Sequence, residues 1–289
     1  MKNKIVELYD LIMGKEMGIL PGNLAFSFFL AIIPILTLIF FITTSFHLPM
    51  DIIQNFLNQT FPSGVVDLLE PIFTDTITFN SLVTLTFGLV VATNGCNAII
   101  MASNTIYNVE NAPLLKRLIK SFILTICIIL LFAFVLMVPL LGRSILSLIS
   151  TFTDFLAHHE VIVKILYFLI QFPVSLLVIF FFIKLVYTIA PDATIPSKYV
   201  NKGALFTTIT WLLITSIFSY YINNIAKYDL IYGNLANIVM LLLWFYALAY
   251  VFVIGLYLNK TISDAGIEKT NSIKLGEIRE KVKKEKYKK

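Results

Sequence analysis

The chain has 289 residues, of which 58% are hydrophobic and 13% are charged, with a formal net charge of +5. Soluble domains carry roughly a quarter charged residues, so this composition argues against a soluble protein. The apolar runs leave no room for a separate soluble domain. The two cysteines, Cys96 and Cys127, lie inside those runs, which favours small buried hydrophobes over a disulfide framework.

The N-terminal segment, residues 1–22, is polar and amphipathic, and the first apolar run begins at Leu24. That run is too long for the apolar core of a signal peptide, and it lacks a small-residue cleavage site. We therefore expect residues 1–22 to be a retained cytoplasmic segment.

Six stretches are long and apolar enough to cross a membrane as helices, which takes about 20 residues each. They are residues 24–46, 80–102, 120–142, 163–187, 203–223 and 232–258. The pattern predicts an all-α fold, a polytopic membrane helical bundle of about six transmembrane helices within a domain of residues 23–260.

Most of the 22 lysines and arginines fall on one side of these spans, whereas the loops of the other side hold Arg143 and Lys227. Basic residues accumulate in cytoplasmic loops, which predicts an inner-membrane protein with both termini in the cytoplasm. The basic tail, residues 261–289, is predicted to be partly disordered. It is suited to anionic lipid, and nucleic acid is not an expected partner.

The two long outer loops, residues 47–79 and 143–161, carry apolar residues at helical spacing. Such periodicity predicts amphipathic helices that are too short to span the membrane. They are expected to lie in the outer interface or to cap the bundle.

A polar stripe marks the second span. Asn94, Asn97, Met101, Asn104 and Asn108 are spaced by three and four residues, so they share one helix face. An amide in hydrocarbon is costly unless it pairs across a helix interface or lines a wet cavity. Both interpretations, interhelical packing and a polar cleft, remain open from the sequence.

Other spans add uncharged polar groups and two prolines that free a backbone carbonyl and favour a kink. Together with the asparagines of the second span, the candidate cleft or substrate-contacting residues are Asn23, Ser27, Pro34, Tyr107, Gln171, Pro173, Thr208, Thr215, Tyr246 and Tyr250.

Ionisable groups are scarce within the spans; Lys164 and Lys184 lie near the ends of the fourth. A proton-coupled carrier normally has an acid or histidine relay at depth, and metal-assisted hydrolysis needs a cluster of ligands. The sequence shows neither pattern, so no catalytic residue, metal or cofactor is expected, and enzymatic activity is disfavoured.

Several segments resemble the YihY/BrkB family of integral membrane proteins, historically labelled ribonuclease BN-like. The resemblance covers about residues 10–260. It is carried by Leu24 to Pro34, Asn104-Thr-Ile-Tyr107, Tyr187 with Pro191, Gly203 with Trp211, Phe218 and Tyr220, Ile231-Tyr232-Gly233 with Trp244, and Gly255-Leu-Tyr-Leu-Asn259. This likeness implies six transmembrane helices. The ribonuclease label does not follow from these residues, because acids, histidines or metal ligands beside a basic groove are missing.

Uncharged polar stripes, prolines within spans and amphipathic outer segments suit a substrate with a polar head and an apolar body. The sequence thus favours a transporter or flippase-like handler of a lipid or envelope amphiphile. The alternative is a non-transporting membrane scaffold for envelope partners. Membrane lipids, envelope proteins and further copies of the chain are the expected partners.

Overall fold

The computed structural model describes residues 13–45, 79–130, 160–224 and 235–286. Those ranges contain helices and connecting turns and no strand, which confirms the predicted all-α membrane bundle. The elements are α2 (Lys15–Ser45), α5 (Phe79–Tyr107), a helix over residues 114–130, α8 (Glu160–Ile189), the 3-10 helix η2 (Ser197–Tyr199), α9 (Asn201–Asn224) and α11 (Ala236–Lys286).

Three helices of the described part are long and apolar enough to cross a membrane. They are Thr86–Tyr107, Asn201–Ile222 and Ala236–Thr261. α2 and α8 cover the first and fourth predicted spans, and the helix of residues 114–130 contains the start of the third. Hydrocarbon offers the backbone no water to bond, so each apolar run satisfies its amides internally as a helix.

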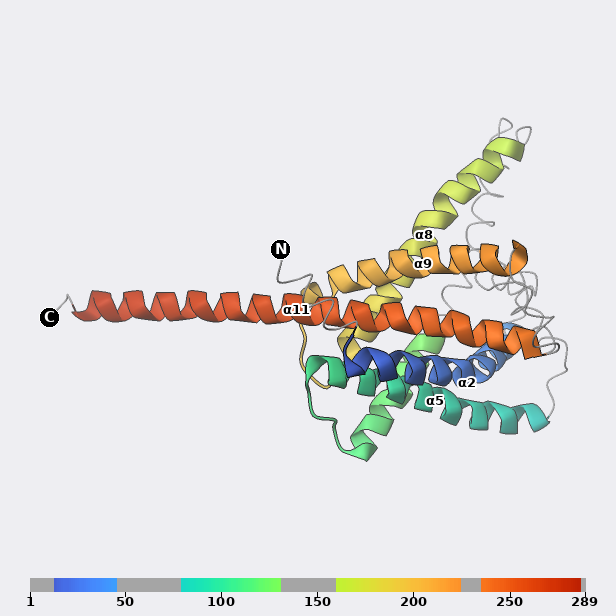
Figure 1. Ribbon diagram of the computed structural model, residues 1–289, viewed down its shortest axis with the longest axis horizontal. Helices are drawn as coiled ribbons and strands as arrows, with labels where there is room; N and C mark the ends of the chain where they lie inside the picture. Colours follow the sequence, from blue (N-terminus) through green and yellow to red (C-terminus); the bar gives the residue numbers. More distant parts are fainter. Residues whose placement is uncertain (1–12, 46–78, 131–159, 225–234, 287–289) are drawn as a thin grey trace.

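The helices α2, α5, α9 and α11 run along the long axis of the molecule (Figure 1). α2 packs against α5 and α11, and α11 also packs against α5 and α9, while α8 contacts α9. α2 and α9 begin, and α5 ends, at the same end of this bundle, from which α11 continues outward (Figure 1). We call this the tail end.

α2 lies close against α5 because Gly95 has no side chain. A Cβ atom built there would lie 3.1 Å from Ala31 Cβ and 3.3 Å from the Ser27 carbonyl oxygen. Small residues at such crossings allow two membrane helices to approach closely and gain van der Waals contact.

Both ends of the predicted transmembrane domain lie within helices. α2 begins at Lys15, with Met17 only 2% exposed in the core, so residues 15–22 are its first turns. α11 continues to Lys286 through the tail for which the sequence predicts partial disorder. A physical reason is that this segment lacks proline and places Glu277 and Glu280 four residues before lysines, a spacing that stabilises helices.

Two predictions are not tested by the described helices. The outer amphipathic helices were expected in loops that fall almost entirely within residues 46–78 and 131–159, outside the described ranges. α2 and α8 each run as one helix through their prolines, Pro34 and Pro173. The kink expected at each proline stays a prediction.

Candidate functional site: a polar clasp and a lateral groove

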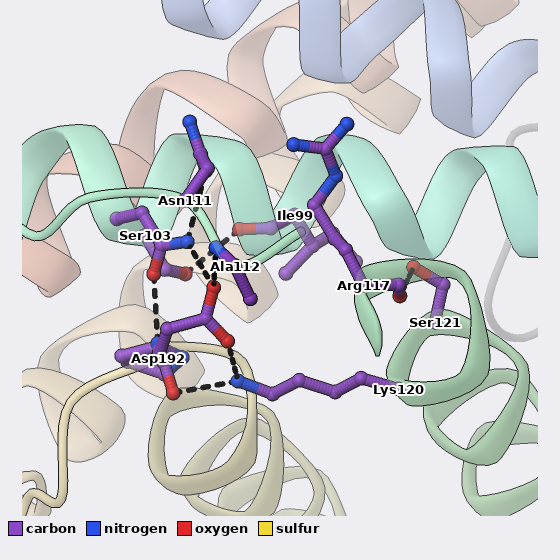
Figure 2. Close-up of polar contacts among 10 residues, drawn as sticks. Ile99, Ser103, Asn111, Ala112, Arg117, Lys120, Ser121 and Asp192 are labelled. Atoms are coloured by element: carbon purple, nitrogen blue, oxygen red, sulfur yellow. Dashed lines mark hydrogen bonds and ion pairs between the residues drawn. The ribbon is translucent and has the colours of Figure 1, made fainter. Parts of the chain in front are cut away.

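The most connected polar group of the described structure is an aspartate that follows α8. Asp192 Oδ1 accepts a hydrogen bond from Lys120 Nζ at 2.7 Å, forming an ion pair, and Oδ2 accepts from Asn104 Nδ2 at 2.7 Å and from the Ala112 amide at 3.1 Å. Lys120 also donates to the Pro191 carbonyl oxygen at 2.7 Å. Figure 2 shows Lys120 and Ala112 approaching the Asp192 carboxylate from two sides.

Asn104 is completely buried, and both polar atoms of its side-chain amide form hydrogen bonds. Its Oδ1 accepts from the Asp192 backbone amide at 2.7 Å, and its Nδ2 donates to Asn111 Oδ1 at 2.9 Å as well as to the Asp192 carboxylate. We call Asn104, Asn111, Ala112, Lys120 and Asp192 the polar clasp. It joins α5, the helix of residues 114–130 and the connection between α8 and α9.

The turn after α5 brings the clasp together. Asn108 adopts a left-handed backbone conformation, with φ 54°, which asparagine tolerates better than most residues. The Val109 amide then bonds the Asn104 carbonyl oxygen at 2.9 Å and closes the helix. The chain reverses there, so that Asn111 reaches Asn104 and the Ala112 amide reaches Asp192.

The Asp192 carboxylate is held in its ionised form. Partial burial alone would raise the pKa of Asp192, but hydrogen bonds from Lys120, Ala112 and Asn104, with the charge of Lys120, outweigh burial and lower the pKa below its usual value. A carboxylate so stabilised is a poor proton carrier near neutral pH. The clasp is therefore a fixed connection between three segments.

This shift predicts a specific pH dependence of stability. Because the folded-state pKa of Asp192 is depressed, its contribution is complete above the unfolded pKa of about 3.9 and is lost as the pH falls through the folded pKa. We expect the difference in free energy of unfolding between the wild type and Asp192→Asn to stay constant from pH 8 to pH 5 and to shrink in stronger acid. Equilibrium unfolding in mixed micelles across this pH range measures it; a difference that already shrinks at pH 6 would contradict a lowered pKa.

A groove of about 390 Å³ lies between α5 and the helix of residues 114–130. Its lining is mostly aliphatic and aromatic, with two threonines and one asparagine. The lining residues are Thr86, Leu89, Val90, Thr93, Asn94, Leu118, Ile119 and Phe122. Val90, Ile119 and Phe122 are exposed, so the groove opens sideways from the bundle.

The asparagines of the predicted stripe have different environments. Asn94 is exposed in the groove, Asn97 is half-buried with its Nδ2 3.9 Å from Met101 Sδ, and Asn104 belongs to the clasp. Asn108 follows the helix, and in the amide orientation that satisfies both of its side-chain atoms its Oδ1 accepts from Lys260 Nζ at 2.9 Å. The stripe thus combines two roles: packing at its tail end and groove lining in the middle of α5.

The other candidate residues are spread over the bundle. Asn23 and Pro173 are exposed, Ser27 and Tyr107 are half-buried, and the side chains of Pro34 and Gln171 lie outside the described part. Thr208 is buried and bonds the Ala204 carbonyl of its own helix at 2.8 Å, while Thr215 accepts from Trp244 Nε1 at 3.3 Å. Tyr246 and Tyr250 pack ring to ring, with centroids 6.3 Å apart. Asn94 is the one described residue of the candidate set that lines the groove.

A second buried polar cluster joins α8, α9 and α11. The Tyr187 hydroxyl donates to the Phe252 carbonyl oxygen at 2.8 Å and lies 2.7 Å from Thr207 Oγ1. Nearby, Asn259 Oδ1 accepts from the Gly203 amide at 2.8 Å. These bonds hold α9 tightly against α11 where both helices carry a glycine.

Sequence reasoning missed the centre of the clasp. Asp192 lies outside every predicted span, and Lys120 contributes to the sequence prediction only as one of the basic residues of the cytoplasmic side. One available signal was position: Asp192 directly follows Pro191 at the end of an apolar run, on the side where lysines predominate. An acidic side chain at this position is therefore expected to form an ion pair with one of the lysines.

Apolar helices that pack side by side, with polar groups gathered at one end, define a polytopic membrane protein. The chain belongs to the family described as Virulence factor BrkB, whose profile matches residues 12–274. This match confirms the resemblance seen in the sequence.

Two relatives match most of the chain. The ribonuclease-like protein YfkH of Bacillus subtilis (strain 168) is 31% identical over 245 residues, which covers 82% of this chain and 87% of the relative. A UPF0761 membrane protein of Haemophilus influenzae (strain 86-028NP) is 26% identical over 257 residues, covering 85% of this chain and 89% of the relative. No solved structure matches the chain significantly.

Proposed function

We propose that this membrane protein handles a lipid or another envelope amphiphile, as a transporter or flippase-like protein. The observation that carries the proposal is the lateral groove with Asn94 exposed within it. An amphiphile matches this combination, because its apolar chain covers the aliphatic walls while its polar part bonds the amide.

The position of Asn94 along α5 favours a ligand with a polar group. It lies near the middle of α5, about 12 Å along the helix from Thr86 at 1.5 Å per residue, and the neighbouring Val90 is 59% exposed. Leaving an amide unbonded in hydrocarbon costs about 1–3 kcal/mol. A lipid headgroup, glycerol or ester group in the groove removes that cost.

We also propose an inner-membrane location with both termini in the cytoplasm, which makes the tail end cytoplasmic. The distribution of lysine and arginine supports this orientation. Anionic lipid is then a natural partner of the basic tail, and envelope proteins or further copies of the chain remain candidate partners. The proposed role is non-catalytic.

The test is native mass spectrometry, with lipid analysis, of protein extracted gently from its own membrane. We expect Asn94→Leu to reduce the amount of one co-purifying lipid or precursor class about tenfold, since the substitution removes a hydrogen bond and fills the groove. Thermal unfolding of the same sample establishes that the variant is folded.

Ser216→Leu is the matched control. Ser216 is an exposed polar residue on α9 that bonds only its own helix, at the Leu212 carbonyl, so the same change of polarity occurs away from the groove. It is expected to keep the wild-type lipid content. Bulk lipid in equal proportions in all three proteins would contradict the proposal and favour the scaffold.

The scaffold alternative has one observation of its own. The outward face of α9 is strongly apolar, with Leu213 57% and Ile217 66% exposed. Such a face suits lipid or a helix of an envelope partner. Loss of a protein partner from an α9 variant, with unchanged lipid content in Asn94→Leu, would support this alternative.

A further inference from the structure

The groove changes in polarity along its length. On α5, Asn94 and Thr93 lie nearer the tail end than Thr86, because α5 ends there. On the facing helix, Leu118 is the first lining residue, and Lys116 and Arg117 come directly before it. From the tail end inward, a ligand meets basic groups, then an amide, then aliphatic walls.

Two buried polar atoms belong to residues that lie close in sequence to the groove lining at its basic end. Arg117 Nε and Asn97 Oδ1 are both buried, and neither has a hydrogen-bond partner among the described residues. Asn97 is one turn from Asn94 toward the tail end, and Arg117 adjoins Leu118. Buried polar atoms are nearly always hydrogen-bonded in proteins, so these two point to a ligand that supplies an acceptor for the arginine and a donor for the amide.

Lys116 and Arg117 form no ion pair with a carboxylate of the described residues. Asp192 is paired with Lys120 at 2.7 Å, and within the described ranges no other carboxylate forms an ion pair with a basic side chain. In Figure 2 the Arg117 side chain points away from Asp192 and Lys120. Lys116 is exposed one turn before Ile119 of the groove wall.

We propose that the groove binds an anionic phospholipid with a hydroxylated headgroup, an inference that rests on the proposed function and names its ligand class. The phosphate oxygens accept from Arg117 and Lys116, and a headgroup hydroxyl donates to Asn97 Oδ1. The glycerol region lies beside Asn94, and an acyl chain follows Leu89, Val90 and Phe122.

Charge and geometry favour this ligand over a zwitterionic lipid. The planar guanidinium of an arginine binds phosphate oxygens in a two-pronged arrangement, and such charge-assisted bonds are about twice as strong as neutral ones. A trimethylammonium headgroup has no donor for Asn97 and places a second positive charge beside Lys116. Phosphatidylglycerol offers both the phosphate and the hydroxyls.

The experiment is a native mass spectrometry competition. The full chain in micelles is titrated with equal amounts of phosphatidylglycerol and phosphatidylcholine, and the ratio of the two bound lipids is measured. We expect the wild type to prefer phosphatidylglycerol and Arg117→Gln to lower the ratio about tenfold, because a charge-assisted bond is lost. Lys202→Gln, which removes an exposed charge at the start of α9, is expected to keep the wild-type ratio.

The outcomes separate this inference from the proposed function. If Arg117→Gln keeps the wild-type ratio while Asn94→Leu loses both lipids, the groove binds amphiphiles but the headgroup assignment is overturned. If neither variant changes binding, both proposals fail. Should Arg117→Gln not fold, Lys116→Gln provides the test, with a several-fold fall in the ratio expected and an unchanged ratio counting against the proposal.

Discussion

Replacing Gly255 by alanine is expected to lower the free energy of unfolding by about 3 kcal/mol, the upper part of the range for overpacking. A Cβ atom at this position overlaps the hydroxyl oxygens of Thr207 and Tyr187. Both hydroxyls lie in the buried network on the Phe252 carbonyl, so neither can move without losing a hydrogen bond worth about 1 kcal/mol. Equilibrium unfolding of the purified protein in mixed micelles measures the change.

Gly22→Ala is the control for that measurement. Gly22 lies inside α2, and a Cβ atom there meets nothing within 4 Å. The substitution is expected to be neutral or to stabilise the helix by up to about 1 kcal/mol, since alanine is the better helix former. Equal losses in both variants would show that glycine flexibility, and not close packing of α9 on α11, explains the effect at Gly255.

Removing the carboxylate of the polar clasp is the second change with a large expected effect. Asp192→Ala removes the carboxylate that Lys120 and the buried Asn104 amide share, which leaves Lys120 with the Pro191 carbonyl and Asn104 with Asn111 Oδ1 as acceptors. The loss of the counter-charge and of these bonds should cost about 2–3 kcal/mol in free energy of unfolding. Truncating one partner of a fully buried ion pair costs about 3–5 kcal/mol. The cost here is smaller because the Lys120 and Asp192 side chains retain 24% and 13% exposure.

Two further variants test whether the loss of stability comes from the polar clasp. The double variant Asp192→Ala with Lys120→Met is expected to recover part of the loss, because no unpaired charge is left at the clasp. Glu110→Ala removes an exposed carboxylate from the same turn and should change stability by less than about 0.5 kcal/mol. If Asp192→Ala behaves like Glu110→Ala, the clasp contributes nothing to stability.

The clasp and the groove meet on one helix. Lys120 of the clasp lies between Ile119 and Phe122 of the groove wall in the sequence. Asp192 therefore anchors the start of the helix that forms one side of the groove. This arrangement holds the groove wall in place against α5.

The candidate site was only partly predictable from the sequence. Helical spacing placed Asn94, Asn97 and Asn104 on one face, and they do follow one helix. Spacing within a helix cannot show what faces it, and the fold brings Asp192 to Asn104 across 88 residues of chain while leaving Asn94 exposed in the groove. The sequence also does not show Asn111 and Lys120 as partners, because the turn at Asn108 and the packing of the α8–α9 connection bring them to Asn104 and Asp192.

The sequence by itself determined the class of protein, the helical content and the family. Hydrocarbon admits only helices or closed barrels, so long apolar runs with few charges dictate helices before any contact is known. Tertiary structure decided which polar groups pack and which stay open, and that α9 and α11 meet through Gly203 and Gly255. These features depend on helix crossings and turns, where distances are set by the partner helix and not by spacing along the chain.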